Sequence, residues 1–395
     1  MTLMQRRSLL LGAGALSLGA CASTTVLPPP PATARTHLPP LNLSSDRIVR
    51  ITVCSRPFRP AGPRVEAESL GDKRLVHNYG HGGSGWSLSW GSAEIARELA
   101  LSGGVGSVAV IGCGAIGLTT ATLLQRAGAR VTVYASERLP ETRSARATGL
   151  WTPDSRIADA DRVDAAFPDV WERMARASWA MHQTYVGQPA EPVAFLDRYG
   201  VGGVRAPDPD TGFQPLPATP PVEIRFASYG SRLAGLTPRS RPLSPDQHGF
   251  QAERVRVAPE MQFNIAELSR RLIADFQADG GRLERRTFHT PADLTALSEP
   301  VIVNCTGYGA RALFGDDTLV PVRGQMAWLP PQPEVRYGFY GNGVSVMSRP
   351  DGVGVQRIAG DMFGYDVEGE TIDTLEAQDA ILRAAAAFAP RPAAV

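Results

Sequence analysis

A glycine motif in the first third of the chain constrains the fold more than any other feature. The segment SVAVIGCGAIG, residues 107–117, places an apolar run directly before glycines spaced as G-x-G-x-x-G. The run predicts a buried parallel strand, residues 118–127 predict the helix after it, and residues 131–134 predict a second strand. A glycine motif framed in this way predicts an α/β fold with a Rossmann-type dinucleotide-binding domain.

Each of the three glycines has a separate role in binding a pyrophosphate. Gly112 allows the tight turn, Gly114 lets the backbone approach the phosphates, and Gly117 lets the helix pack against the strand. The helix N-terminus, with Ala115 and Ile116 inside the motif, supplies free amides and the positive end of the helix dipole. We therefore predict that these five residues contact the cofactor.

The end of the second strand is the usual place for an acid that binds the ribose. Ser136 occupies one of the two most suitable positions, and Glu137 follows it. Both residues are candidate cofactor ligands. Glu137 either binds the ribose or is simply solvated, and the sequence leaves both possibilities open.

Two further patches favour a flavin over a nicotinamide. TRS at 142–144 precedes ATGLW at 147–151, and VIVNCTGYGAR spans 301–311. The first patch resembles the flavin-clasping loop of the D-amino-acid oxidase family, and the second resembles the late strand of FAD-dependent oxidoreductases. The resemblance implies FAD as the cofactor. It also implies cofactor contacts from Thr142, Arg143, Ser144, Gly149, Leu150, Phe288, Thr306 and Gly307.

A long segment before the glycine motif resembles the same family more closely. Residues 55–99 read SRPFRPAGPRVEAESLGDKRLVHNYGHGGSGWSLSWGSAEIAREL, with R-P-x-R-P followed by H-N-Y-G-H-G-G-x-G. In the D-amino-acid oxidase family this signature comes after the substrate domain, at the far end of the chain. Nothing like it recurs after residue 330, which argues against a duplication. We predict a circular permutation of the family's chain, with a fused fragment or a mis-spliced assembly as the alternative.

Within this signature the resemblance implies the substrate and flavin contacts. Arg56 matches the arginine that binds the substrate carboxylate, a task suited to a guanidinium fork, and its alternative role is a structural ion pair. Gly83 matches the residue whose carbonyl accepts a bond from the substrate amine. The glycine-rich turn and a helix expected to begin near Trp90 would stabilise negative charge on the reduced flavin. The expected flavin contacts here are Gly82, Gly83, Ser84, Gly85, Trp86 and Ser87.

The region 337–355 departs from the family pattern. Family members carry a tyrosine where this chain has Ser345; Tyr340 is the expected second tyrosine, and Tyr337 is a weaker substitute. In the family these tyrosines position the substrate. The predicted reaction class therefore stands, whereas substrate choice and efficiency stay open.

Charge and cysteine usage exclude several classes of function. The formal net charge is +1, so nucleic acid is not an expected partner. His77 and His81 lack an evident third ligand, so no metal site is predicted. Cys54, Cys113 and Cys305 are widely spaced, form no C-x-x-C pair and are expected to be free thiols.

The N-terminal residues predict export. Arg6 and Arg7 precede a short apolar run, residues 9–20, which falls short of the ~20 apolar residues that span a bilayer. The arginine pair suggests the twin-arginine route. LGAC at 18–21 resembles a bacterial lipobox, which implies that Cys21 is lipidated and that the protein is anchored to the membrane facing the periplasm. An ordinary signal peptide with a chance cysteine is the alternative.

The expected organisation pairs a Rossmann-type FAD domain with a mixed α+β substrate domain in permuted order. The segments are an export signal at 1–21, a proline-rich tether at 22–45, the permuted signature at 46–104, the Rossmann segment at 105–155, substrate-domain segments at 156–250 and 316–370, a further FAD-domain segment at 251–315, and a terminal helix and tail at 371–395.

The resemblance implies oxidative deamination of a D-amino acid. Hydride passes from Cα to flavin N5, the imine hydrolyses to a 2-oxo acid and ammonia, and oxygen is reduced to hydrogen peroxide. The expected partners are therefore a small D-amino acid and oxygen. The alternatives are a glycine/sarcosine-type amine dehydrogenase that passes electrons to a membrane acceptor, and a flavin-binding envelope protein without turnover.

Overall fold

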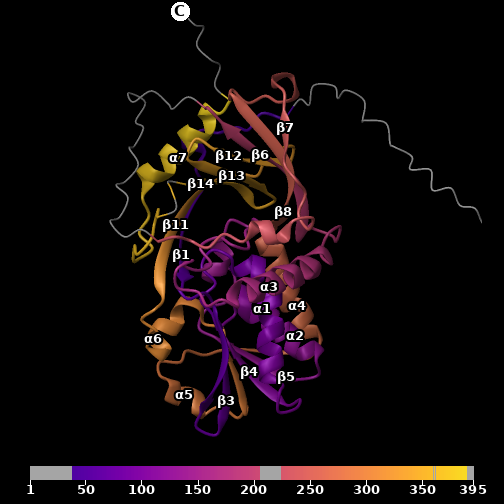
Figure 1. The fold of residues 1–395 in the computed structure, drawn as a ribbon, viewed down its shortest axis with the longest axis vertical. Coiled ribbons are helices and arrows are strands. Elements are labelled where there is room, and N and C mark those ends of the chain that lie inside the picture. The colour runs from indigo at the N-terminus through magenta and orange to yellow at the C-terminus, as the bar shows by residue number, and fades with distance from the viewer. Residues whose placement is uncertain (1–37, 205–223, 359, 361, 389–395) are drawn as a thin grey trace, which may run out of the picture.

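The computed structural model describes residues 38–204, 224–358, 360 and 362–388. The expected export signal, its Cys21 and most of the tether lie outside these residues. The described chain forms two β-sheets with helices packed around them (Figure 1). Within this part of the chain, no helix is both long enough and apolar enough to cross a lipid bilayer.

The lower half of the molecule in Figure 1 is built on a six-stranded sheet. Its strands are, in spatial order, β2 (Arg64–Leu70), β3 (Lys73–Tyr79), β10 (Val301–Asn304), β4 (Ser107–Ile111), β5 (Arg130–Ala135) and β9 (Arg282–Arg285). All neighbours are parallel except β2 and β3. β4 and β5 are buried along almost their whole length, as expected of apolar parallel strands that are covered on both faces.

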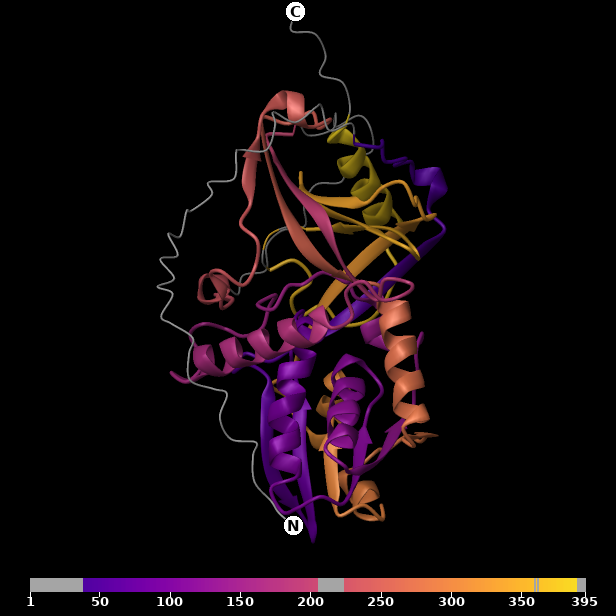
Figure 2. The same cartoon turned by 90° about the vertical axis from the view of Figure 1, so that its right-hand side faces the viewer.

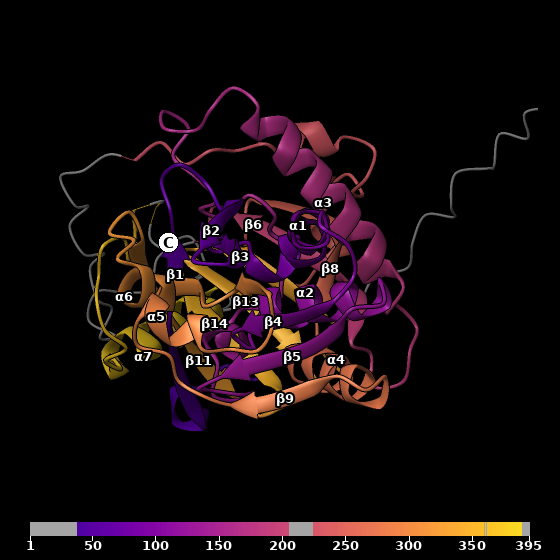
Figure 3. The ribbon, with the colours of Figure 1, turned by 90° about the horizontal axis from the view of Figure 1, so that it is seen from below.

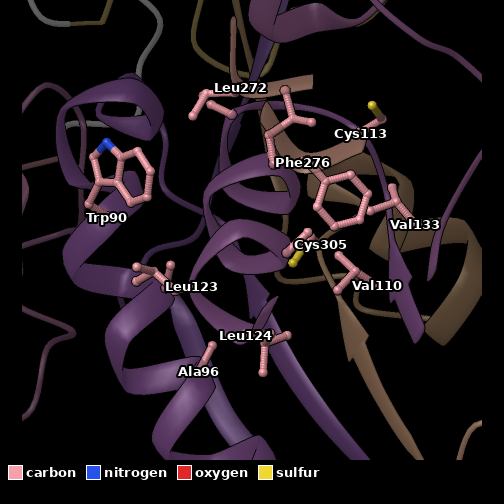
Figure 4. Packing of buried hydrophobic residues seen from close by; sticks show 14 of the residues in the cluster. Trp90, Ala96, Val110, Cys113, Leu123, Leu124, Val133, Leu272, Phe276 and Cys305 are labelled. Carbon is pink, nitrogen blue, oxygen red and sulfur yellow. The ribbon is translucent and has the colours of Figure 1, made fainter. Parts of the chain in front are cut away.

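Helices cover both faces of this sheet (Figure 3). One face carries α1 (Gly85–Ala100), α2 (Ala115–Arg126) and α4 (Ile265–Ala278), and the other carries α5 (Pro291–Thr295) and α6 (Ala310–Phe314). Figure 4 shows the first of these cores, in which Trp90, Leu124, Val110 and Phe276 bring together α1, α2, β4 and α4. Each such side chain contributes about 1.5–3 kcal/mol when it is buried.

The upper half is built on an eight-stranded sheet. Its strands are, in spatial order, β1 (Arg50–Phe58), β11 (Val320–Leu329), β14 (Gly352–Arg357), β13 (Val344–Arg349), β12 (Tyr337–Gly341), β6 (Val193–Gly202), β8 (Arg254–Phe263) and β7 (Arg241–Leu243). Neighbours are antiparallel except β12 and β6. The sheet is therefore mixed, as expected of the substrate domain.

The two faces of the eight-stranded sheet differ in polarity. Val344 and Val346 of β13 pack with α7 (Thr374–Ala386) in one apolar cluster. Ser345 lies between them on the strand and lines a cavity on the opposite face. Its partners in the neighbouring strands, Tyr340 and Gln356, line the same cavity. The period-two alternation of a strand thus separates a structural face from a face that is open to a ligand.

The remaining elements connect these two halves. α3 (Phe167–Gln183) lies directly on α1: the backbone amide of Gly91 donates to Ser178 Oγ at 2.8 Å, and a Cβ at Gly91 would lie 2.2 Å from the carbonyl oxygen of Met174. The described 3₁₀ helices are η1 (Ser45–Arg47), η2 (Arg143–Arg146), η4 (Gly230–Leu233), η5 (Pro245–Gln247) and η6 (Gly307–Gly309).

The first and last described residues lie side by side. Leu41 and Ala387 are buried in the same apolar cluster, with Leu38 and Phe388 packed against it. In Figure 2 the start of the described chain lies next to α7 at the top of the molecule. Only a short connection would therefore be needed to join these two ends.

Some expected boundaries differ from the structure. The helix expected near Trp90 begins at Gly85, and the helix expected from residue 118 begins at Ala115. Glycine disfavours helix interiors, so the motif glycines suggested a later start; in the first turn, where amides have no intrahelical partner, glycine is tolerated. β1 and β8 fall in ranges expected for the FAD domain, yet their partners, β11 and β6, place them in the eight-stranded sheet.

Candidate active site

A cavity of about 580 Å³ lies between the two sheets. Ile111 and Tyr134 line it from the six-stranded sheet, while Arg56 and Tyr340 line it from the eight-stranded sheet. All the residues predicted to contact cofactor or substrate line this cavity, except Gly117 and Ser84, which lie beside it in the two glycine-rich turns. The fold thus gathers residues from opposite ends of the chain in one place.

The glycine motif has the close packing that its spacing predicts. Gly112 has a φ of 110°, and its amide donates to the carbonyl of Tyr134 at 2.8 Å. A Cβ at Gly117 would lie 2.0 Å from the carbonyl oxygen of Gly112, so no larger residue fits there without a backbone shift. Gly114 is the N-cap of α2, whose first turn therefore points its free amides at the cavity.

Ser136 and Glu137 follow β5 and line the cavity beyond the glycine motif. Both are exposed. Phe288 lies at this end as well, with its ring edge-on to Tyr134 at 5.9 Å between centroids and the guanidinium of Arg286 4.8 Å from its own centroid. These groups form the wall expected for the adenosine half of a dinucleotide, and Glu137 keeps both of its possible roles.

The segment 142–150 closes over the start of α2. Ser144 Oγ accepts a hydrogen bond from the amide of Ala115 at 3.0 Å, and the carbonyl of Ser144 accepts one from the indole of Trp86 at 2.9 Å. Gly149 has a φ of 80° and continues into Leu150, which also lines the cavity. Thr142 Oγ1 is buried and has no hydrogen-bond partner among the described residues.

The turn after β10 provides the next part of the wall. The amide of Cys305 donates to the carbonyl of Ile111 at 2.8 Å, which fixes the end of β10 beside the glycine motif. Thr306 Oγ1 donates to Asn304 Oδ1 at 2.7 Å, and Gly307 has a φ of 59°. The turn after β10 therefore lines the cavity beside the glycine motif, and its contact with the cofactor stays a prediction.

The turn GHGGSG leads directly into α1. Gly82 has a φ of 53°, and a Cβ there would lie 1.8 Å from the carbonyl oxygen of Arg156. The amide of Gly83 donates to the carbonyl of Ser155 at 2.9 Å. Ser84 is the N-cap of α1, and Gly85 to Ser87 form its first turn. The positive end of α1 is therefore closer to the turn than a helix beginning near Trp90 would have placed it.

Arg56 lies on β1 at one side of the cavity. It is half-buried, and a Cβ at Gly324 on the neighbouring strand would lie 2.4 Å from its Nη2, so that glycine makes room for the guanidinium. Burial lowers the pKa of Arg56, and the Cys54 thiol beside it opposes that shift. No carboxylate among the described residues pairs with Arg56. A buried cation of this kind gains from an anionic ligand.

Arg59, three positions after Arg56 in the sequence motif, has a structural role. Its Nε lies 3.6 Å from Asp316 Oδ2, and its Nη1 donates to the carbonyl of Gly62 at 3.2 Å. The two arginines of the R-P-x-R-P segment thus differ: one is bound by the protein and the other faces the cavity.

Tyr340 and Ser345 occupy adjacent strands at the other side of the cavity. Tyr340 is 51% exposed, and Ser345 is buried and accepts a hydrogen bond from Arg198 Nη2 at 2.5 Å. Arg198 and its partner Glu260 were not among the residues expected at the site. Neither belongs to a sequence motif, and the pairing of their strands could not be predicted from sequence. Both line the cavity. Tyr337, the weaker candidate, is buried and donates to the carbonyl of Pro39, away from the cavity.

The histidines of the signature and the three cysteines of the described chain have structural contacts or free thiols. His77 Nε2 contacts Glu68 at 3.1 Å, and His81 Nε2 contacts Ser92 Oγ at 2.7 Å; burial lowers the pKa of His81 to about 3. No group of three or more His, Cys, Asp and Glu residues in the described chain is placed to hold a metal ion. Cys54, Cys113 and Cys305 are free, and burial raises the pKa of all three thiols.

The donors and walls of the cavity fit a bound dinucleotide. Two helix N-termini, those of α1 and α2, open onto the cavity, and such positions stabilise phosphate and other negative charge. Thr142 Oγ1 supplies a buried hydroxyl that still has no partner among the described residues. A parallel sheet with this glycine motif, joined to a second sheet across one cavity, defines a flavin-dependent oxidoreductase.

The comparison with known families names that class directly. Residues 107–395 match the family described as "FAD dependent oxidoreductase". The chain therefore belongs to this family. FAD is therefore its cofactor. The match begins at the first residue of β4, so the segment that carries Arg56 and Gly83 precedes it in the chain.

Two curated relatives are about a third identical to this chain over the aligned residues. It is 32% identical over 223 residues to a D-amino-acid oxidase of Streptomyces coelicolor, covering 56% of this chain and 58% of that one. It is 31% identical over 229 residues to a D-amino-acid oxidase of Rubrobacter xylanophilus, covering 56% of this chain and 59% of that one. The chain thus spans less than two thirds of the length of these relatives.

Among solved structures, the chain is similar to an L-proline dehydrogenase from P.horikoshii. That alignment has 12% sequence identity and a TM-score of 0.45, and it covers 72% of this chain and 77% of the other.

Proposed function

We propose that this protein oxidises D-amino acids to 2-oxo acids, with release of ammonia and hydrogen peroxide. The observation that carries the proposal is Arg56, a half-buried guanidinium that faces the cavity and pairs with no carboxylate of the described chain. A substrate carboxylate would form a bidentate ion pair with the guanidinium of Arg56. The identity of 32% to a D-amino-acid oxidase supports the same reading.

In this proposal the protein binds and orients the substrate. Arg56 holds the carboxylate, the carbonyl of Gly83 accepts from the substrate amine, and Tyr340 closes the opposite side. When bound, FAD would supply the acceptor for the hydride from the substrate Cα and the route of its electrons to oxygen. The imine product then hydrolyses to the 2-oxo acid and ammonia. Cys54 takes no part as a nucleophile, because burial raises the pKa of its thiol.

The N-terminus of α1 assists the same reaction electrostatically. Gly85, Trp86 and Ser87 of its first turn lie on the cavity wall. The positive end of this helix would stabilise negative charge that develops on the cofactor during the reaction. The amides of Gly82 and Gly83 donate to the carbonyls of Pro57 and Ser155, so the turn before the helix is fixed and needs little reorganisation as that charge forms.

An anaerobic reduction experiment tests the proposal. The FAD-loaded protein is mixed without oxygen with paired D- and L-amino acids, and the visible absorption of the flavin is followed. We expect D-enantiomers to bleach the flavin and L-enantiomers to leave it oxidised. Bleaching by L-enantiomers alone, or by none, would contradict the proposal. Re-admission of air should then give hydrogen peroxide in equal amount to the product; bleaching without peroxide would favour an amine dehydrogenase with another acceptor.

We also propose that the chain order arose by circular permutation. Residues 50–79 supply β1 to one sheet and β2 and β3 to the other, so this segment is an integral part of both halves. Leu41 and Ala387 share one apolar cluster, which makes a former connection at that point feasible. A chain that starts at residue 107, runs to 388 and continues through a short linker into 38–104 should retain its FAD content and melting temperature. Loss of both would refute the permutation.

We further propose that the protein is exported and anchored by a lipid on Cys21. The arginine pair and the LGAC tetrad support this, and both lie outside the described residues. Labelled palmitate should be incorporated into the full chain in a bacterial host and not into the Cys21→Ala variant. Equal labelling of the two chains would exclude the lipid anchor.

A further inference from the structure

Two charged side chains lie across the cavity from Arg56. Arg198 is on β6 and Glu260 is on β8, close to one edge of the eight-stranded sheet. Arg56 is on β1, which forms the opposite edge of that sheet. Figure 1 shows this sheet curving, with β1 and β11 on one side and β6 and β8 on the other. All three residues line the same cavity, so a ligand held by Arg56 extends toward the Arg198–Glu260 pair.

Arg198 is held rigidly by the protein. Its Nη1 donates to the carbonyl of Val346 at 2.7 Å, its Nη2 donates to Ser345 Oγ at 2.5 Å, and its Nε lies 3.0 Å from Glu260 Oε2. The guanidinium also lies 5.5 Å from the ring centroid of Tyr340. Because each of its three nitrogens already has a protein oxygen nearby, Arg198 is a positioning residue rather than a free cation.

Glu260 is less completely satisfied. Its side chain is 29% exposed, compared with 10% for Arg198, so it is the member of the pair that the cavity reaches more easily. Glu260 Oε2 is buried 3.0 Å from Arg198 Nε, whereas Glu260 Oε1 is not buried and accepts no hydrogen bond from the described residues. Burial raises the pKa of Glu260, and Arg198 opposes that shift. A carboxylate in these surroundings gains from an N–H donor.

We propose that Glu260 binds the side chain of the substrate, and that this side chain is long and ends in an N–H donor, either an amide or an ammonium group. The inference rests on the proposed function, since Arg56 must hold the α-carboxylate on the opposite wall. Length is required because β11, β14, β13 and β12 separate the two walls. A side chain that ends in a carboxylate would meet Glu260 as a like charge, and the nitrogens of Arg198 are already engaged.

A comparison of matched substrates tests the proposal. D-glutamine, D-lysine, D-asparagine and D-glutamate are mixed anaerobically with the FAD-loaded protein, and apparent Kd values come from the concentration dependence of flavin reduction. We expect D-glutamine or D-lysine to bind about 10- to 100-fold more tightly than D-glutamate, which is the effect of one charged hydrogen bond. The tighter of the first two identifies the amide or the ammonium as the ligand. Equal binding, or tighter binding of D-glutamate or D-asparagine, would overturn the proposal.

Variants of the pair show whether Glu260 causes the selectivity. Glu260→Gln should reduce the ratio of the D-glutamate Kd to the D-glutamine Kd at least tenfold, because an amide can donate to the substrate carboxylate. The matched control is Glu334→Gln, an exposed position between β11 and β12, which should leave the ratio unchanged. Arg198→Lys should alter the ratio without abolishing FAD binding. An unchanged ratio in a Glu260→Gln protein that keeps its FAD would also overturn the proposal.

The outcomes separate this inference from the proposed function. If none of the four D-amino acids reduces the flavin, the proposed function fails. Their Kd values can then be taken from the perturbation of the flavin absorption, so the preference for an N–H donor is still measured. If the flavin is reduced equally well by all four, the function stands and the role of Glu260 fails.

Discussion

The two sheets of this protein differ in strand direction, in the helices that cover them and in the groups that they present to the cavity. The six-stranded sheet is parallel except at one edge, is covered by helices on both faces, and presents only the ends of its strands to the cavity. The eight-stranded sheet is mixed, packs α7 on one face, and turns a row of polar side chains toward the cavity on the other. The first sheet positions backbone amides, and the second positions side chains.

This difference leads to separate expectations for cofactor and substrate. The turns and helix N-termini of the first half suit phosphate and flavin, and they require glycine only where the backbone path demands it. In the proposed function the substrate contacts particular side chains that line the cavity, such as Arg56 and Glu260, and these can change without altering the fold. We therefore expect cofactor binding to depend on the first sheet and substrate choice on the second.

The largest effect on stability is expected from the buried charges under the second sheet. Asp379 on α7 is 1% exposed and accepts hydrogen bonds from Arg357 and, at 2.9 Å, from Arg383. Asp379→Ala leaves two buried guanidinium groups without this partner, and should lower the free energy of unfolding by about 3–5 kcal/mol. Thermal or urea unfolding measures it. Gln378→Ala, exposed on the same helix, is the control; equal losses in the two variants would contradict the prediction.

The next largest effect concerns substrate binding on the second sheet. Arg56→Ala should raise KM for the D-amino acid about 30- to 5,000-fold, because removal of one partner of a buried charge pair costs about 2–5 kcal/mol. FAD content should stay unchanged. Arg59→Ala should lower stability and leave KM nearly constant, since Arg59 pairs with Asp316. A KM for Arg56→Ala within threefold of the unmodified value would remove Arg56 from the carboxylate role.

A smaller effect is expected from the backbone path of the first sheet. Gly117→Ala places a Cβ 2.0 Å from the carbonyl of Gly112, and overpacking of this kind costs about 1–3 kcal/mol. The Kd for FAD should rise roughly 5- to 150-fold, whereas KM of the remaining FAD-loaded protein should change little. Equilibrium titration with FAD measures the first quantity. Gly106→Ala, in open space between α1 and β4, tests whether any added methyl has the same effect.

Over a single pH unit, the smallest effect is the change in stability that comes from two buried histidines, His81 beside the glycine-rich turn and His182 on α3. Burial lowers the pKa of His81 to about 3 and that of His182 to about 4, from an ordinary value of 6.5. Both are neutral when folded and take up a proton when unfolded, so stability falls as pH drops below about 6.5 and stops falling near the folded values. The slope should be about 1.4 kcal/mol per pH unit for each histidine.

Replacing one histidine at a time checks this assignment. His81→Gln should flatten the fall in the free energy of unfolding between pH 6 and pH 4, measured by urea unfolding. His289→Gln, exposed in the turn after β9, should leave the profile as it is. If the His81→Gln profile stays as steep as that of the unmodified protein, the acid sensitivity comes from other groups.

Much of the first sheet and its cofactor turns was predictable from sequence. The motif from Gly112 to Gly117 predicted a strand, a turn and a helix because all the required contacts are local. The same holds for the turn at Gly82 and Gly83, where positive φ and close approach demand glycine. Only the helix starts were displaced, by three residues at Ala115 and by five at Gly85.

The second sheet was much less predictable. β6 lies in the expected substrate-domain segment 156–250, whereas β8 lies in a segment expected for the FAD domain, and their antiparallel pairing joins residues far apart in sequence. Arg198 and Glu260 belong to those strands, and as single polar residues they follow no motif. The loss of a tyrosine at Ser345 was visible in the sequence, whereas the arginine that bonds to this serine was not.

By itself, the sequence determined that the chain binds a dinucleotide through glycine turns and that Arg56 and Gly83 belong with that site, because these features depend on short stretches of backbone. Only the tertiary structure decided which residues face Arg56 across the cavity. It brought Glu260 and Arg198 there through strand pairing between distant segments, and it placed Leu41 beside Ala387 at the two ends of the chain. These contacts between distant segments are stabilised by burial of whole apolar faces of the sheet and its helices. A short local sequence pattern does not determine which faces pack together.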